Sequence, residues 1–90
     1  MRKVARTDTN QSAIVQALRD AGCSVQLLHQ MGGGIPDLLV ATPSGETLLI
    51  EVKSDKGSLT PDQMQWMSRW RGRVEVVRTV EEALAAVEVH

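Results

Sequence analysis

The hydrophobic positions of the chain repeat with two different periods, and the changes of period mark the predicted elements. Apolar residues recur at helical spacing in residues 8–21, which predicts a first helix. Thr7 or Asp8 can cap its start, and Gly22 can end it. Residues 23–27 then alternate between apolar and polar side chains, so a strand is expected next.

A hairpin is predicted in the middle of the chain. The triplet Gly32–Gly34 and Pro36 interrupt regular structure, and residues 38–40 form a short apolar run. The turn-forming residues 42–45 separate that run from a second one at residues 47–53. Two runs joined by so short a turn are expected to pair in antiparallel fashion.

The last third of the chain carries the signals of a helix, a strand and another helix. Thr60 as cap and Pro61 at the first helical position predict a helix. That helix is expected to run to about Arg71. Residues 74–78 have strand character, and Thr79 opens a capping box for a final helix.

The order α-β-β-β-α-β-α predicts an α/β fold in which a mixed central β-sheet is flanked by helices. Residues 1–90 contain no internal repeat, no low-complexity tract and no linker. A chain of this length forms one domain at most, so a single domain is expected.

Charged residues fall at the end of the predicted hairpin, where they are costly. Asp37 lies at the mouth of the first strand, while Glu51 and Lys53 project from one face of the second. The apolar run before them predicts an interior strand, in which uncompensated charges are unfavourable. Two carboxylates held together also repel each other. A divalent cation would relieve both problems, and an all-oxygen site favours Mg²⁺ or Mn²⁺, with the backbone carbonyl of Val52 as a further candidate ligand.

Each fragment of this motif also has a purely structural interpretation. Glu-x-Lys at a strand end is common at solvated edges, and Pro-Asp after glycines is common in turns. Taken alone, each fragment favours that interpretation. The combination is more specific, because Glu51 follows Asp37 by fourteen positions and closes the partner strand.

The motif Pro36-Asp37…Glu51-Val52-Lys53 resembles the Pro-Asp…(Asp/Glu)-x-Lys signature of the restriction-endonuclease-like superfamily, whose core order α-β-β-β-α-β matches the predicted one. The fuller pattern is narrower. The glycine triplet before the motif, and Leu59-Thr60-Pro61-Asp62-Gln63 with Trp66 after it, resemble the virus-type replication-repair nuclease (VRR-NUC) domain. That domain is the catalytic module of Fanconi-associated nuclease and also occurs as standalone phage proteins, the type that this chain resembles over nearly its whole length.

The resemblance implies a metal-dependent endodeoxyribonuclease. It makes Asp37 and Glu51 metal ligands, Lys53 the catalytic lysine and Gln63 a support of the active site. Gln63 has an equally good structural interpretation, because Thr60-x-x-Gln63 is also a capping box. The two roles are compatible.

The first helix departs from the family pattern. Many relatives carry a metal-binding glutamate there, whereas this chain has Asn10 and Gln11. An amide can supply a carbonyl oxygen but no charge, so a weaker contribution of the first helix to metal binding is expected.

The formal net charge of −1 gives no overall attraction to DNA, so the distribution of charge matters more than its sum. Glycines of the triplet can let backbone amides approach a phosphate, or can simply form a turn. For any single arginine, a solvated surface charge is the commoner interpretation. His29 could reach the site, although a lone histidine more often has a structural role. The candidate nucleic-acid-binding residues are Gly33, Gly34, Lys56, Arg69 and Arg71.

Trp66 and Trp70 are the only large aromatic residues of the chain and lie four positions apart on the predicted second helix. Core packing is the default interpretation of such spacing. Together with Met64 and Met67, however, they spread around the helix, which predicts that some face a second subunit. Base stacking is a third interpretation. A two-fold homodimer through this helix would match the two strands of a duplex or branched junction.

The expected function is a Mg²⁺- or Mn²⁺-dependent endonuclease acting on DNA, with cleavage of Holliday junctions or flaps implied by the resemblance. Two alternatives stay open: a nuclease-like module that grips branched DNA without cutting it, and an assembly subunit that works through the Trp/Met helix. A single cysteine and the lack of an apolar run of membrane-span length predict a cytoplasmic protein. The resemblance to standalone phage proteins implies that the cell is bacterial or phage-infected.

Overall fold

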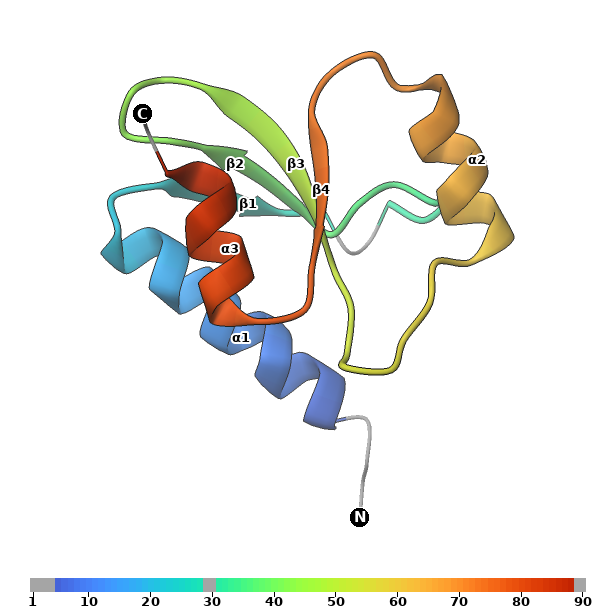
Figure 1. Cartoon of the computed structure of the whole chain (residues 1–90), viewed down its shortest axis with the longest axis horizontal. Coiled ribbons are helices and arrows are strands. Elements are labelled where there is room, and N and C mark those ends of the chain that lie inside the picture. Colours follow the sequence, from blue (N-terminus) through green and yellow to red (C-terminus); the bar gives the residue numbers. More distant parts are fainter. Residues whose placement is uncertain (1–4, 29–30, 89–90) are drawn as a thin grey trace.

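A computed structural model describes residues 5–28 and 31–88, with side chains described from residue 10 onward. The helices are α1 (Ala5–Asp20), α2 (Pro61–Arg69) and α3 (Val80–Val87), and the strands are β1 (Ser24–Leu27), β2 (Leu38–Ala41), β3 (Thr47–Val52) and β4 (Val74–Val77). The strands form one sheet in the order β1-β2-β3-β4 (Figure 1). The first two pairs are antiparallel and β3 pairs with β4 in parallel, so the predicted mixed α/β fold and its element order are confirmed.

The predicted hairpin is formed by β2 and β3. Leu38 lies opposite Ile50, and Ala41 lies opposite Thr47 across the short turn. Because β3 has β2 on one side and β4 on the other, it is an interior strand, as expected. Extending this register by one step brings residue 37 to the level of Glu51, which is how the fold aligns the charged motif.

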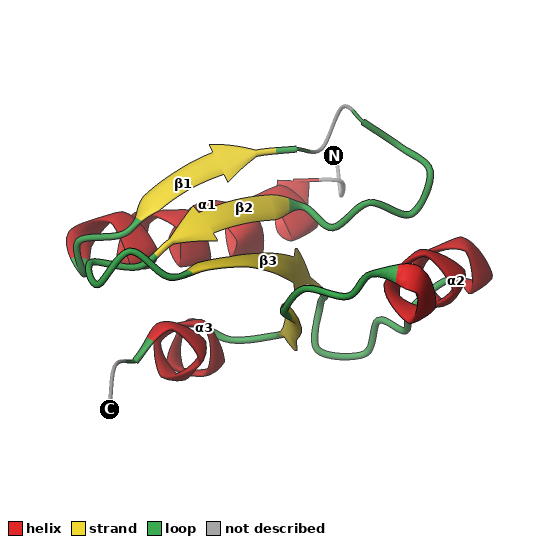
Figure 2. Cartoon of the chain, turned by 90° about the horizontal axis from the view of Figure 1, so that it is seen from above, coloured by secondary structure: helices red, strands yellow, loops and turns green. Residues whose placement is uncertain are grey.

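The hydrophobic core lies on one face of the sheet, beneath α1 and α3. Figure 2 shows α1 behind the strands and α3 alongside them, while α2 stands apart beyond their ends. Side chains that alternate along β2 and β3 point into this core, and Leu39 and Glu51 consequently belong to the opposite face. The fully buried core side chains include Ile14, Leu18, Leu38, Val40, Leu48, Ile50 and Val77.

The limits of α1 differ in part from the prediction. The helix begins at Ala5, so the proposed caps Thr7 and Asp8 lie inside it, and the expected start at residue 8 is wrong. Residues of moderate helix propensity do not interrupt a helix whose later turns are packed. The predicted end is confirmed, because Gly22 has φ +95° and Cys23 N–H donates to the Leu18 carbonyl at 3.0 Å. These are the features of a Schellman motif.

Helix α2 is attached to the fold chiefly through its first turn. It begins after Thr60 with Pro61 at the first helical position, as predicted, and it has no buried residue. Gly34, at φ +85°, lies so close to this turn that a Cβ there would collide with the Asp62 carbonyl, 2.8 Å from its carbon. The turn interpretation of the glycine triplet therefore has a physical basis at Gly34.

No helix in the described part of the chain is long and apolar enough to span a membrane.

Gly34→Ala is expected to destabilise the protein more than Gly33→Ala. Both residues have positive φ, which costs a residue with a side chain about 1–2 kcal/mol. Only at Gly34 does the added methyl group also meet backbone atoms, whereas nothing lies within 4 Å of a Cβ at Gly33. Urea unfolding of both variants tests this, and equal losses of unfolding free energy would contradict the proposed contact.

Candidate active site

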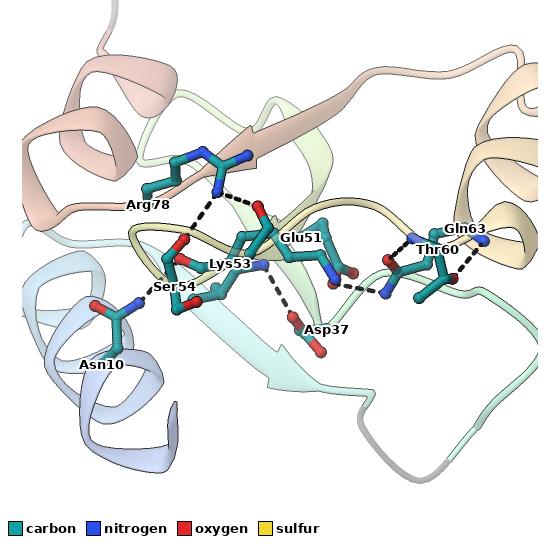
Figure 3. A network of polar contacts seen from close by, with 10 residues as sticks. Asn10, Asp37, Glu51, Lys53, Ser54, Thr60, Gln63 and Arg78 are labelled. Atoms are coloured by element: carbon teal, nitrogen blue, oxygen red, sulfur yellow. Dashed lines mark hydrogen bonds and ion pairs between the residues drawn. The ribbon is translucent and has the colours of Figure 1, made fainter. Parts of the chain in front are cut away.

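Asp37 lies just before β2 and is joined to the end of β3 by a hydrogen bond. Its Oδ2 atom accepts from the backbone N–H of Val52 at 2.9 Å (Figure 3). The Asp37 backbone carbonyl also accepts from Leu28 N–H at 2.7 Å, so the residue is fixed between the ends of β1 and β3. Asp37, Glu51 and Lys53, separated in sequence, are thus brought together at one end of the sheet.

Glu51 is the most unusual residue of the site. It is only 2% exposed although it carries a carboxylate. Its Oε2 atom accepts from the Gln63 side-chain amide at 2.9 Å and lies 3.7 Å from the Lys53 ammonium nitrogen. Its Oε1 atom is buried and has no hydrogen-bond partner among the residues described. One oxygen is therefore held by donors and the other is unsatisfied.

The environment of Glu51 opposes its negative charge. Burial, and next the neighbouring Asp37 charge, raise the pKa of Glu51 from its usual 4.5 to about 7, while the Lys53 ammonium acts in the opposite direction. Raised carboxylate pKa values are typical of functional sites. A positive charge placed next to both carboxylates would favour the charged form of Glu51 and so oppose the two effects that raise this pKa.

The loop after Lys53 is held by Asn10, which the sequence analysis singled out on the first helix, and by Arg78, which it did not. The Asn10 amide of α1 donates to the Lys53 carbonyl at 3.2 Å. From the other side, the Arg78 guanidinium donates to the carbonyls of Ser54 at 2.8 Å and Gly57 at 2.6 Å (Figure 3). These bonds fix the backbone that carries the lysine. Gln11 instead lines a shallow groove between α1 and β1, with Arg19 and Leu27 among its walls.

Most of the candidate nucleic-acid contacts are exposed, and two of them share one groove. Lys56, Arg69 and Arg71 are exposed, and Gly33 and Arg69 line a groove of about 470 Å³ beside Trp66 and Trp70. Among the late arginines, Arg73 is engaged with Glu46 and Glu75, and Arg78 holds the loop described above. The exposed positive charge near α2 is therefore smaller than the count of arginines suggests. His29 lies outside the described residues.

The donor set fits a divalent cation with oxygen ligands. Glu51 Oε1 is a buried acceptor without a donor, and Asp37 lies close enough to repel it. Among the residues whose side chains are described, no group of three or more His, Cys, Asp or Glu side chains gathers, and Asp37 and Glu51 are the two carboxylates brought together at the site. Mg²⁺ characteristically uses one or two carboxylates and retains several waters. The Val52 carbonyl remains a predicted third protein ligand.

A mixed sheet whose hairpin presents Asp37 and Glu51-Val52-Lys53 at one end defines the restriction-endonuclease-like class of nuclease folds. A family model described as the VRR-NUC domain matches residues 2–87, and the chain belongs to this family. It is also similar to a solved structure described as a VRR-NUC domain, with a TM-score of 0.76 and 26% sequence identity over 92% of this chain and 97% of that one. A search of curated proteins finds no match. Since VRR-NUC domains are nuclease domains, DNA is the substrate class that the family implies.

Glu51→Gln is expected to stabilise the metal-free protein at pH 8 but not at pH 4. A carboxyl whose folded-state pKa is about 7 and whose usual value is 4.5 makes the folded state lose stability as pH rises between these values. Removing the charge should recover up to about 3 kcal/mol above pH 7. Thermal unfolding in EDTA across this pH range measures the effect. Glu88→Gln, at an exposed position, is the control, and a variant less stable than wild type at pH 8 would contradict the account.

Proposed function

We propose that the protein is a Mg²⁺- or Mn²⁺-dependent endonuclease that hydrolyses phosphodiester bonds of DNA, as the family membership suggests. The observation that carries the proposal is the buried, unpartnered Oε1 atom of Glu51 beside a second carboxylate and a lysine. In a purely structural ion pair, a second acid beside Glu51 would only add repulsion to a carboxyl that already resists ionisation. In a cation-binding site, the second acid supplies another ligand.

Each residue has a distinct task in this mechanism. Asp37 and Glu51 hold the cation, and Gln63 and the Val52 N–H hold the two carboxylates in place. When bound, the cation supplies Lewis-acid polarisation of a phosphate oxygen and acidifies water. Lys53, whose side chain keeps 15% of its surface exposed, stabilises the negative charge that develops on the phosphate.

DNA would reach the site across the exposed side of the loops that surround it. Lys56, Arg69 and Arg71 offer charge to the phosphate backbone there, and Gly33 leaves its backbone accessible. We infer a preference for branched DNA, such as four-way junctions or flaps, from the family resemblance together with the dimer proposed below.

Lys53→Ala is expected to slow cleavage at least about 100-fold at saturating DNA, because a charge-stabilising group is lost. Asp37→Asn should have an effect of the same order. Lys56→Ala is the matched control: it removes an exposed lysine three residues away and should weaken DNA binding while leaving the rate at saturation nearly unchanged.

Cleavage of duplex, flap and four-way junction substrates with Mg²⁺, Mn²⁺ or EDTA provides the measurement. Activity of the wild type that survives EDTA would contradict the mechanism. Binding of DNA without cleavage under all three conditions would favour a non-cutting module instead.

We also propose that two copies associate through α2. This helix has no buried residue, and two large apolar side chains are exposed on it and at its C-cap: Met64 is 52% and Trp70 is 47% exposed. Trp66 stacks on Trp70 with ring centroids 4.8 Å apart, which joins the two rings into one apolar surface. Aromatic residues and methionine are enriched at the cores of interfaces.

Met64→Asp is expected to shift the protein from dimer to monomer, because it places a charge in the proposed interface. Met31→Asp is the control, since Met31 is 63% exposed but lies on the loop before Gly32 and outside α2. Size-exclusion chromatography with light scattering reports the mass directly. A wild type that is monomeric at working concentration would remove the dimer from the proposal.

A further inference from the structure

The N-terminal cap of α2 is directly connected to Glu51. Gln63 N–H donates to the Thr60 hydroxyl at 3.1 Å, and Thr60 N–H donates to the Gln63 side-chain oxygen at 2.9 Å, so both halves of a capping box are present. The same Gln63 side chain uses its nitrogen to donate to Glu51 Oε2 at 2.9 Å. One amide thus closes the cap with its oxygen and reaches the carboxylate with its nitrogen (Figure 3).

This arrangement allows only one orientation of the Gln63 amide. If the amide were rotated by half a turn, its oxygen would face the Glu51 carboxylate and its NH₂ group would face the Thr60 N–H. Both contacts would then be between groups of the same kind, and two hydrogen bonds would be lost. The cap therefore determines that Glu51 Oε2 meets a donor, which leaves Oε1 as the unpartnered oxygen.

Helix α3 has a threonine cap without the full capping box that the sequence predicted, because the Glu82 side chain bonds to Arg78 and not to the Thr79 backbone. A threonine cap alone therefore does not need a glutamine. Thr79 accepts from Glu82 N–H at 3.0 Å, and the Glu82 carboxylate accepts from Arg78 N–H at 2.6 Å. Glutamate suits this position because it only has to accept. At α2 a glutamate would present an acceptor to Glu51, so only an amide can serve both partners.

We propose that the Thr60–Gln63 cap is a positioning device for the active site, which orients Glu51 so that its Oε1 atom is kept for the cation. The proposal rests on the function proposed above and adds Thr60 to the residues on which it depends. Thr60 acts through Gln63 and does not itself touch the reacting groups. The first turn of α2 and the orientation of Glu51 are then linked through one side chain.

The test measures binding of Mn²⁺ alone, without DNA, by EPR of the free ion, together with thermal stability. Thr60→Val removes the hydroxyl at nearly constant shape and should weaken Mn²⁺ binding at least about threefold, and Gln63→Met about tenfold, as for other groups that orient metal ligands. Thr60→Ser should restore wild-type affinity. Thr79→Val, the matched loss of a cap at α3, should lower the melting temperature and leave Mn²⁺ affinity unchanged.

A double-mutant cycle separates positioning from general stability. Once Gln63 is replaced by Met, adding Thr60→Val should weaken Mn²⁺ binding no further, because Thr60 acts only through that side chain. Wild-type affinity in Thr60→Val, or an equal loss in Thr79→Val, would overturn the positioning role while leaving the proposed nuclease intact. If the wild type does not bind Mn²⁺, or if its Mn²⁺ affinity is no higher than that of Asp37→Asn, both the proposed function and this inference are overturned.

Discussion

The structure around the candidate site depends on one constraint, the burial of the Glu51 carboxylate at the end of an interior strand. A buried charge without compensation is unfavourable by several kcal/mol, and here a second acid lies nearby and raises the pKa of Glu51 further. Gln63 and Lys53 compensate one oxygen only. The other oxygen, Oε1, has no partner among the described residues. A free acceptor of this kind is what a bound cation would need, whereas a carboxylate with donors on both oxygens would leave no atom for it.

The small size of the chain explains how the fold divides its surfaces. Among the described residues, the main hydrophobic cluster lies on one face of the sheet under α1 and α3, and Leu49 is buried on the other face. The opposite face and α2 contribute less to this cluster; they carry Glu51 and Gln63, and the exposed Trp70 follows α2 as its C-cap. Stability and chemistry are thus separated by the two faces of β3, whose alternating side chains belong to one or the other. An element free of core packing is also free to bind a partner.

The sequence predicted those features that follow from local pattern. Alternation and turn residues located the hairpin, and the hairpin register placed Asp37 next to Glu51. The pattern could not reveal contacts made through backbone carbonyls, such as those of Asn10 and Arg78 with the loop after Lys53, because a carbonyl acceptor has no signature in the sequence. The predicted start of α1 is wrong for a different reason. Thr7 and Asp8 are favourable N-cap residues, but they can also lie inside a helix, and here they do.

Asn10 and Gln63 show why a site with two acids can be preferable to one with three. The Asn10 amide is occupied with the Lys53 carbonyl, so α1 contributes by holding the backbone near the lysine. An aspartate at this position could not donate that bond. A third carboxylate close to Glu51 would add to the repulsion by Asp37 that already raises the pKa of Glu51. Gln63 thus orients the Glu51 carboxylate and Asn10 holds the backbone after it, and neither amide adds negative charge to the two acids.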